Sequence, residues 1–190
     1  MNHMKKNQVM RRQWLAWLTM CVCFPGCASQ VGSDAGQGPD QQRRFRDIGL
    51  VLVVDAIPGA EMEGVVFYND RGTSIYASSI VAKRNREIMA LGSPRVPLTV
   101  RIIWRDHPKA IWGQHGGIDY EGTILGDHTI PVAARIPDEV LRDIRAKGGA
   151  LRLKFRLKPD GVLFGWDIER PGGGISRFDM PGGDFLETRY

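Results

Sequence analysis

The side chains best suited to hold a metal ion lie between residues 106 and 128. His107 and His128 each follow an aspartate, His115 lies between them, and Asp119 is near. Imidazole and carboxylate groups both bind zinc, so these residues define a candidate metal site. The histidine spacings of 8 and 13 residues match no closed metal motif, which favours polar loop positions and predicts that no metal is bound.

Other catalytic chemistry has little support in the sequence. It contains no Gly-x-Ser-x-Gly elbow, P-loop, dinucleotide fingerprint or His-Glu-x-x-His. Asp167 and Glu169 could act as an acid–base pair, but they alternate with apolar residues beside a basic strand, which favours a cross-strand ion-pair face. Ser78 and Ser79 have no identifiable base. We predict a protein that is not an enzyme and uses no cofactor.

Two segments have the composition of binding surfaces. Arg152, Lys154 and Arg156 alternate with apolar residues, and such a stripe would meet an acidic partner or lipid headgroups, or would simply be solvated. The segment 106–121 is predicted to be a loop and carries Trp112 and Tyr120. Aromatic residues on loops often anchor a protein partner. The alternative is that Trp112 fills the core from a connection.

The first 27 residues have the organisation of a bacterial export signal. A basic segment precedes 11 uncharged, mostly apolar residues, Trp14–Phe24, too few to span a bilayer comfortably. Gly26 before Cys27 resembles the lipobox of bacterial lipoproteins, in which the cysteine is acylated and the leader is cut before it. Phe24 and Pro25 depart from the usual Leu and Ala or Ser. We expect residues 1–26 to be a signal peptide and Cys27 the lipidation site; the alternatives are a cleaved signal without lipid and an uncleaved anchor.

The net charge of +5 arises almost entirely in this leader. Residues 1–26 hold four bases and no acid, so the remainder has 22 Lys and Arg against 21 Asp and Glu, or +1. A nucleic-acid partner is therefore not expected. All three cysteines lie at or before residue 27, so the rest of the chain has none for a disulfide.

Residues 27–44 are predicted to form the lipidated cysteine and a flexible tether. Residues 28–44 contain no aromatic side chain and a single large aliphatic one, Val31, so they cannot offset the entropy of ordering. The globular part is expected to be a single domain over residues 45–190, large enough to bury a core.

Strand patterns dominate this domain. Ile48–Val54 is continuously apolar, as in a strand covered on both faces. Met62–Tyr68 and Ser74–Ala82 flank a turn-prone segment, and Arg95–Trp104 alternates cleanly. Gly122–Ala134 is a weaker candidate for one or two strands.

The alternation from Leu151 to Ile168 predicts a hairpin around a Pro-Asp-Gly turn. A two-residue loop would align Phe155 with Phe164 and Arg152 with Asp167, and would place all eight apolar residues on one face. A type I turn with a glycine bulge would shift this register by one residue. We favour the first register because it keeps the apolar face intact.

One amphipathic helix is predicted near 137–147. Pro137 suits the first helical position, the acids at the start and the bases at the end suit the helix dipole, and Gly148 can end the helix. A shorter helix near Arg84–Leu91 is possible, and the Gly- and Pro-rich segments 171–174 and 181–183 indicate loops. These elements predict an α+β fold, mainly antiparallel β in a sandwich-like sheet, with that helix packed on it.

Several segments together resemble a group of uncharacterised proteobacterial lipoproteins that are often encoded beside type VI secretion phospholipase effectors. The resemblance covers most of residues 96–185 and rests on Gly26-Cys27, Val96–Trp104, Arg135–Val140, Leu151–Leu157 with Gly165–Ile168, and Gly182–Phe185. Relatives of this kind are regarded as immunity proteins, which bind a cognate lipase in the periplasm and block it. These motifs are structural, and Cys27 is the residue whose role carries over.

The resemblance implies a membrane-tethered periplasmic protein that binds and occludes a secreted phospholipase. It also implies an outer-membrane location, because Ala28 and Ser29 follow the cysteine in place of Asp. Several acyl chains would hold the protein firmly. The alternatives are a structural or assembly lipoprotein of the envelope or secretion apparatus, and an enzyme of unrecognised type that uses His107, His115 or Asp119.

Overall fold

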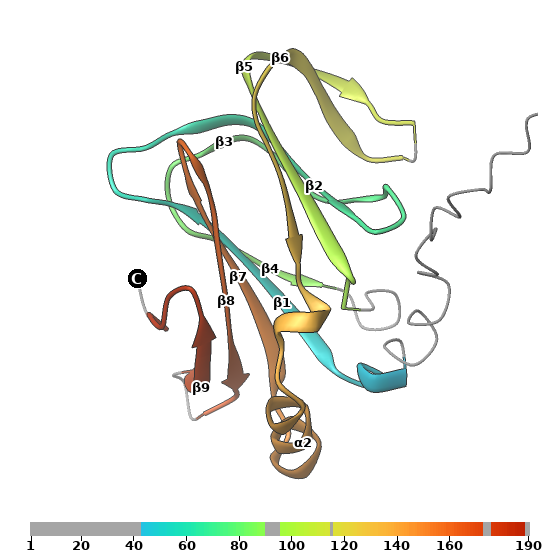
Figure 1. The fold of residues 1–190 in the computed structure, drawn as a ribbon, viewed down its shortest axis with the longest axis vertical. Coiled ribbons are helices and arrows are strands. Elements are labelled where there is room, and N and C mark those ends of the chain that lie inside the picture. The colour runs from blue at the N-terminus through green and yellow to red at the C-terminus, as the bar shows by residue number, and fades with distance from the viewer. Residues whose placement is uncertain (1–42, 90–95, 115, 173–175, 189–190) are drawn as a thin grey trace, which may run out of the picture. The chain divides into compact units, whose positions relative to one another are not determined.

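The computed structural model describes residues 43–89, 96–114, 116–172 and 176–188, whose strands form two packed sheets with a helix at one end (Figure 1). Cys27, the leader and the tether up to residue 42 lie outside the described residues. The elements in chain order are β1 Gly49–Ala56, β2 Met62–Asn69, β3 Ser74–Val81, β4 Asn85–Met89, β5 Thr99–Trp112, β6 Ile118–Pro131, the 3₁₀ turn η2 Ala133–Arg135, α2 Asp138–Lys147, β7 Ala150–Lys158, β8 Gly161–Arg170 and β9 Arg177–Gly183.

The first sheet has the strand order β4-β1-β7-β8-β9. Strands β1 and β7 are parallel, and every other pair in this sheet is antiparallel. The β7–β8 hairpin has the favoured register, with Phe155 opposite Phe164 and Arg152 opposite Asp167. The alternation of apolar residues was therefore sufficient to determine the register of this hairpin.

The second sheet is antiparallel, with the order β3-β2-β5-β6. Its inner face packs on the inner face of the first sheet, and the two faces share one apolar core. Phe67 of β2 contacts Phe155 of β7 across the gap, with ring centroids 5.2 Å apart in an edge-to-face arrangement. The predicted α+β, sandwich-like architecture with mainly antiparallel strands is confirmed.

Helix α2 covers one end of the sandwich through Val140, Leu141 and Ile144, which are all buried. The helix begins at Asp138, because Pro137 has extended backbone angles and is the residue before the first turn. The position predicted for Pro137 was thus wrong by one residue. Gly148, at φ +76°, ends the helix and donates its N–H to Ile144 O.

Three sequence-based predictions of local structure are corrected. The segment expected to be a short helix contains strand β4, which pairs with β1. The predicted loop at 181–183 is the end of strand β9. The predicted loop 106–121 is mostly strand, because β5 and β6 continue through it and leave only 113–117 as the connection. In each case pairing with a neighbouring strand decided a segment whose own sequence pattern was weak.

No helix in the described part of the chain is long and apolar enough to cross a membrane.

Candidate partner-binding surface

The outer part of the β5–β6 hairpin forms the end of the sandwich opposite α2 (Figure 1). Trp112 lies at its tip with 80% of its surface exposed, and Ile118, Ile124 and Leu125 are each about half exposed or more. Large apolar side chains gathered on one exposed element are typical of protein-binding surfaces. We call these four residues the hairpin surface.

A hollow of about 570 Å³ lies beside the hairpin surface, between the hairpin tip and the β2–β3 turn. Its size is within the range of ligand clefts and is large enough for more than one side chain of a partner. Trp112, Ile118 and Ile124 line it together with polar side chains, so it offers apolar walls and a polar floor.

The polar floor is built around Tyr68 of β2. Its hydroxyl is hydrogen-bonded to Asp119 of β6 and to Arg105 of β5. Burial, and secondarily the hydrogen bond to Asp119, raises the pKa of Tyr68 to about 12. Arg105 lies with Nη1 4.0 Å from Asp119 Oδ1 and is only slightly exposed. The phenol therefore stays neutral at any physiological pH and fixes the two charged groups beside it.

A second ion pair lies on the same face of the sheet. Arg101 donates to both carboxylate oxygens of Asp127, at 2.8 and 2.5 Å. The Arg101 hydrogen bond holds the pKa of Asp127 below its ordinary value. Both arginines of the hollow thus have a carboxylate neighbour, although Arg105 Nη1 makes no hydrogen bond. We take the apolar side chains of the hollow as its main means of recognition.

A smaller hollow of about 400 Å³ lies at the same end of the sandwich. It is lined by Trp104 and Leu125 and by three carboxylates, Glu61, Glu63 and Asp106. Arg105 lines this hollow as well, so acidic side chains outnumber basic ones by three to one on this side of the hairpin surface. A partner that covers it would offer apolar side chains with basic residues around them.

The structure separates the two aromatic residues predicted to bind a partner. Trp112 is exposed, so the alternative that it fills the core is wrong. Tyr120 is only 8% exposed, so its interpretation as an exposed anchor is also wrong. The two are on paired strands, and burial raises the pKa of the Tyr120 phenol.

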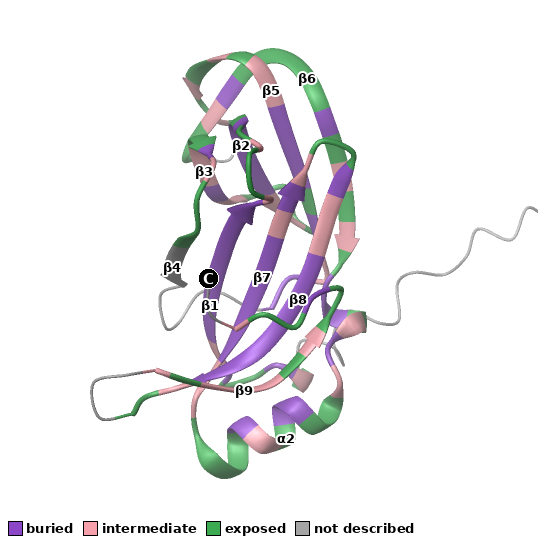
Figure 2. Cartoon of the chain, turned by 90° about the vertical axis from the view of Figure 1, so that its left-hand side faces the viewer, coloured by how far each residue is buried: buried purple, intermediate pink, exposed green. Residues whose placement is uncertain are grey.

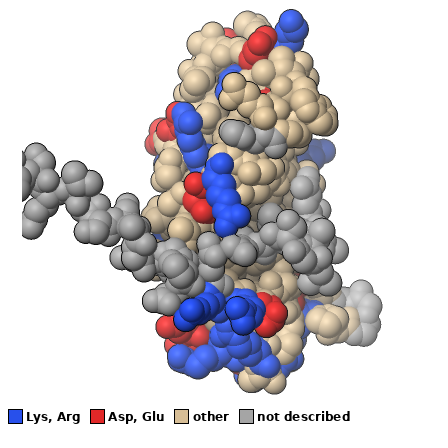
Figure 3. All heavy atoms as spheres, turned by 90° about the vertical axis from the view of Figure 1, so that its right-hand side faces the viewer, with Lys and Arg blue, Asp and Glu red and all other residues tan. Residues whose placement is uncertain are grey.

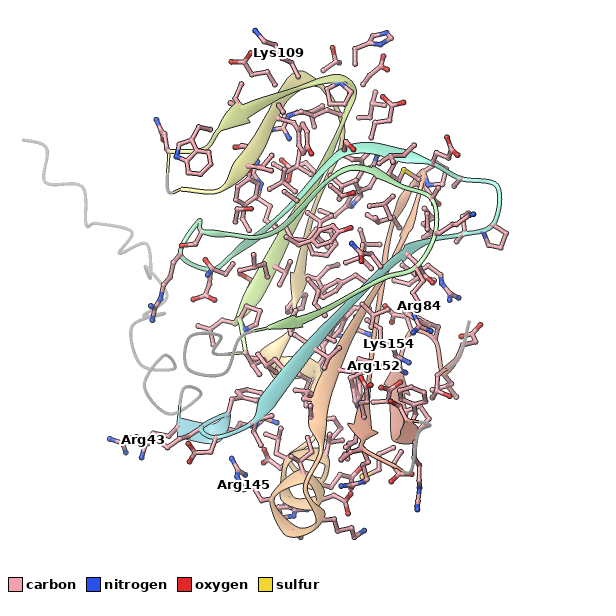
Figure 4. The ribbon with its side chains drawn as sticks, turned by 180° about the vertical axis from the view of Figure 1, so that it is seen from behind. Arg43, Arg84, Lys109, Arg145, Arg152 and Lys154 are labelled. Carbon is pink, nitrogen blue, oxygen red and sulfur yellow. The ribbon has the colours of Figure 1, made fainter. Side chains whose placement is uncertain are left out.

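The basic stripe on β7 is not exposed, contrary to expectation. Arg152 and Lys154 have no exposed surface at all, and Arg156 is mostly covered. A direct contact between Arg152 or Lys154 and a partner is therefore excluded as the chain is folded here. Figure 4 shows Arg152 and Lys154 side by side near the C-terminal segment.

Arg152 and Lys154 form a buried ion-pair network with Asp167 of β8. Arg152 donates to both oxygens of Asp167 at 2.6 Å, and Lys154 Nζ lies 3.1 Å from the same carboxylate. Burial lowers the pKa of Lys154, and the charge of Asp167 opposes that shift. The ion-pair face expected around Asp167 is thus present, but as an interior feature, while Glu169 accepts a hydrogen bond from Ser176.

The C-terminal segment covers this network. The backbone carbonyls of Glu187 and Thr188 accept hydrogen bonds of 2.8 Å from Lys154 and Arg152. The Phe185 ring lies 4.9 Å from Lys154 Nζ and 4.5 Å from Arg156 Cζ. Residues 185–188 therefore cover the outer face of β7, which is buried on both faces (Figure 2).

The candidate catalytic and metal-binding residues do not form a site in the described residues. His107 is almost fully exposed and His128 stacks on Trp104, with ring centroids 5.1 Å apart, while His115 lies outside the described residues. No group of three or more His, Cys, Asp or Glu that could hold a metal occurs in the described residues. Ser78 donates its hydroxyl to the backbone of Ile80.

Sequence reasoning missed the apolar residues of β6. Ile124 and Leu125 are neighbours in β6, where its register against β5 shifts between Trp104 and Arg105, and both are exposed. Adjacent apolar residues in a strand at the edge of a sheet cannot both reach the core, and this was the available signal. It could not be used without knowing that β6 is an edge strand.

The fold and surface define an α+β sandwich with an exposed apolar hairpin at one end. Comparison of the chain with protein-family models, with curated proteins and with solved structures found no match.

Proposed function

We propose that this chain is a membrane-tethered periplasmic binding protein whose hairpin surface covers a protein partner. The observation that carries the proposal is the exposure of Trp112 beside a hollow with apolar walls. A tryptophan in such a position is the residue type that most often dominates a protein interface. This role requires no catalytic group, and the protein is proposed not to be an enzyme.

The proposed partner is a type VI secreted phospholipase, as the resemblance implies, and the proposed mechanism is occlusion. The hairpin would block the mouth of the lipase active site or keep its lid from opening. Tethering through an acylated Cys27 would concentrate the inhibitor at the membrane where a lipase acts. The acidic surroundings of the hairpin surface favour a basic partner surface, in place of the acidic one expected from an exposed basic stripe.

The test is inhibition of the lipase that the resemblance implies is encoded beside this chain's gene, measured as phospholipid hydrolysis. The chain should inhibit, and Trp112→Ala should weaken inhibition at least about 30-fold, as expected for a residue that dominates an interface. The matched control is Leu186→Ala, because Leu186 is a comparably exposed apolar residue on the C-terminal segment. Its inhibition should equal that of the unaltered chain.

Two outcomes would contradict the proposal in different ways. Full inhibition by Trp112→Ala would show that the hairpin surface is not the interface. No inhibition by the unaltered chain would remove the immunity role. The alternative is then a structural or assembly lipoprotein of the envelope or secretion apparatus, whose binding to envelope proteins would persist in strains that lack a lipase gene nearby.

A further inference from the structure

The end of the sandwich opposite the hairpin is rich in arginine. The first described residues include Arg43 and Arg46, and helix α2 contributes Arg142 and Arg145; all four are exposed. Figure 3 shows Lys and Arg side chains gathered at this end, and Figure 4 places Arg43 and Arg145 near α2 with Lys109 at the far end. We call this surface the α2 pole.

Opposite charges predominate at the two ends of the described residues. Residues 43–47, α2 and Arg170, which contacts Asp143 of α2, carry seven bases and four acids, or +3. The hairpin end, taken as 57–63, 105–125 and 158–161, carries three bases and six acids, or −3. The sequence as a whole hides this asymmetry because the two contributions cancel.

The tether joins the domain at the α2 pole. Residues 28–42 number 15 and connect Cys27 to Arg43. If these residues form the flexible tether predicted from the sequence, their root-mean-square span would be about 20 Å. A lipid on Cys27 would therefore hold the α2 pole within a few Debye lengths of the membrane surface, where a basic surface is attracted to anionic headgroups.

We infer that the α2 pole docks on the anionic phospholipids of the membrane that holds the anchor. This inference rests on the lipid anchor of the proposed function and deepens it. An acyl anchor and a basic surface together bind a membrane more firmly than either alone. Docking by the α2 pole turns the acidic end and Trp112 away from the membrane, toward a partner arriving from the periplasm.

Hydrogen bonds of Arg44 and Arg145 join the two segments that form the pole. Arg44 forms an ion pair with Asp138 and donates to the carbonyls of Ala133 and Ile136, which binds the first described residues to the start of α2. Arg145 donates to the carbonyl of Arg44 from the other end of the helix. Two segments far apart in the sequence are thus joined into one basic surface.

The test is a lysine-acetylation footprint of the full, exported protein recovered from membranes. The protein is added from detergent to preformed vesicles of two compositions. One is phosphatidylcholine alone, and the other replaces a quarter of the lipid with phosphatidylglycerol. Lys147 at the end of α2 is the reporter and Lys109 on the hairpin is the internal control; both are exposed. With phosphatidylglycerol, acetylation of Lys147 should slow about fivefold, and high salt should abolish the effect. Acetylation of Lys109 should not change.

The variant Arg46→Gln/Arg142→Gln should remove this protection, because each base near an anionic surface contributes about a fivefold change in affinity. The matched control is Arg71→Gln/Lys83→Gln, which removes the same charge from exposed positions outside the pole and should keep the protection.

Each remaining outcome overturns the inference. Equal acetylation of Lys147 on both vesicles means that the α2 pole does not dock. Protection of Lys109 instead means that the hairpin end faces the lipid. A protein that floats with neither vesicle has no anchor, which removes the tether together with this inference. No lipase is present in the assay, so it is independent of whether the hairpin surface binds one.

Discussion

The buried network of Arg152, Lys154 and Asp167 gives the sharpest test of the structure. In Asp167→Asn, two cations without exposed surface lose their shared carboxylate, while the shape of the side chain is kept. Breaking a buried ion pair from one side costs about 3–5 kcal/mol. For a domain of this size that loss lowers the melting temperature by roughly 10 °C.

The sign of the accompanying pH effect follows from Lys154. Burial lowers its pKa in the folded protein, and loss of Asp167 removes a group that opposes this shift. The folded variant therefore binds fewer protons than the unfolded chain as pH approaches the ordinary lysine range. Its stability should rise with pH over that interval, relative to the unaltered chain.

The assay is urea unfolding followed by tryptophan fluorescence at several pH values. The control is Asp127→Asn, which breaks the exposed Arg101–Asp127 pair and should cost less than about 1 kcal/mol. If the two substitutions cost the same small amount, the Arg152 network is solvated in solution. The argument that Arg152 and Lys154 are too buried to contact a partner would then be refuted.

Two further predictions concern the second sheet. Asp119→Asn should lower the pKa of Tyr68 from about 12 toward its ordinary value, as measured by absorbance titration. The pKa should not reach the ordinary value, because burial is the larger cause of the shift. An unchanged pKa would contradict the hydrogen bond between Tyr68 and Asp119. Gly126→Ala should destabilise the fold by about 1–3 kcal/mol, because the new Cβ would lie 2.1 Å from the buried Trp104 ring. Gly49→Ala, whose Cβ meets ordinary contacts of 3.4 Å, is the control in thermal unfolding, and equal losses would contradict the packing.

Local sequence patterns determined the elements whose residues repeat strongly. The alternation in β7 and β8 specified their register, since a shift by one residue would have turned every apolar side chain outward. The capping residues and apolar stripe specified α2 to within one residue. The Gly-Cys pattern at residue 27 predicts a lipid anchor. Cys27 lies outside the described residues, so the anchor stays a prediction.

Pairing between distant segments decided the rest. The residues of β4 form a strand because they pair with the edge of β1. The sequence around β4 gives no sign of that edge, because β1 lies some thirty residues earlier in the chain. The same reason applies to the outer part of the β5–β6 hairpin, where residues expected in a loop pair across 14-residue strands.

Burial of charge was the feature that the sequence could least indicate. Alternating Arg and Lys in a strand has the same pattern whether its outer face meets water or another segment of the chain. Residues 185–188 cross that face and supply carbonyls, an aromatic ring and a carboxylate to the cations. The sequence by itself thus determined which residues share the polar face of β7. Only the tertiary structure decided that this face is interior, because a segment some thirty residues away in the chain covers it.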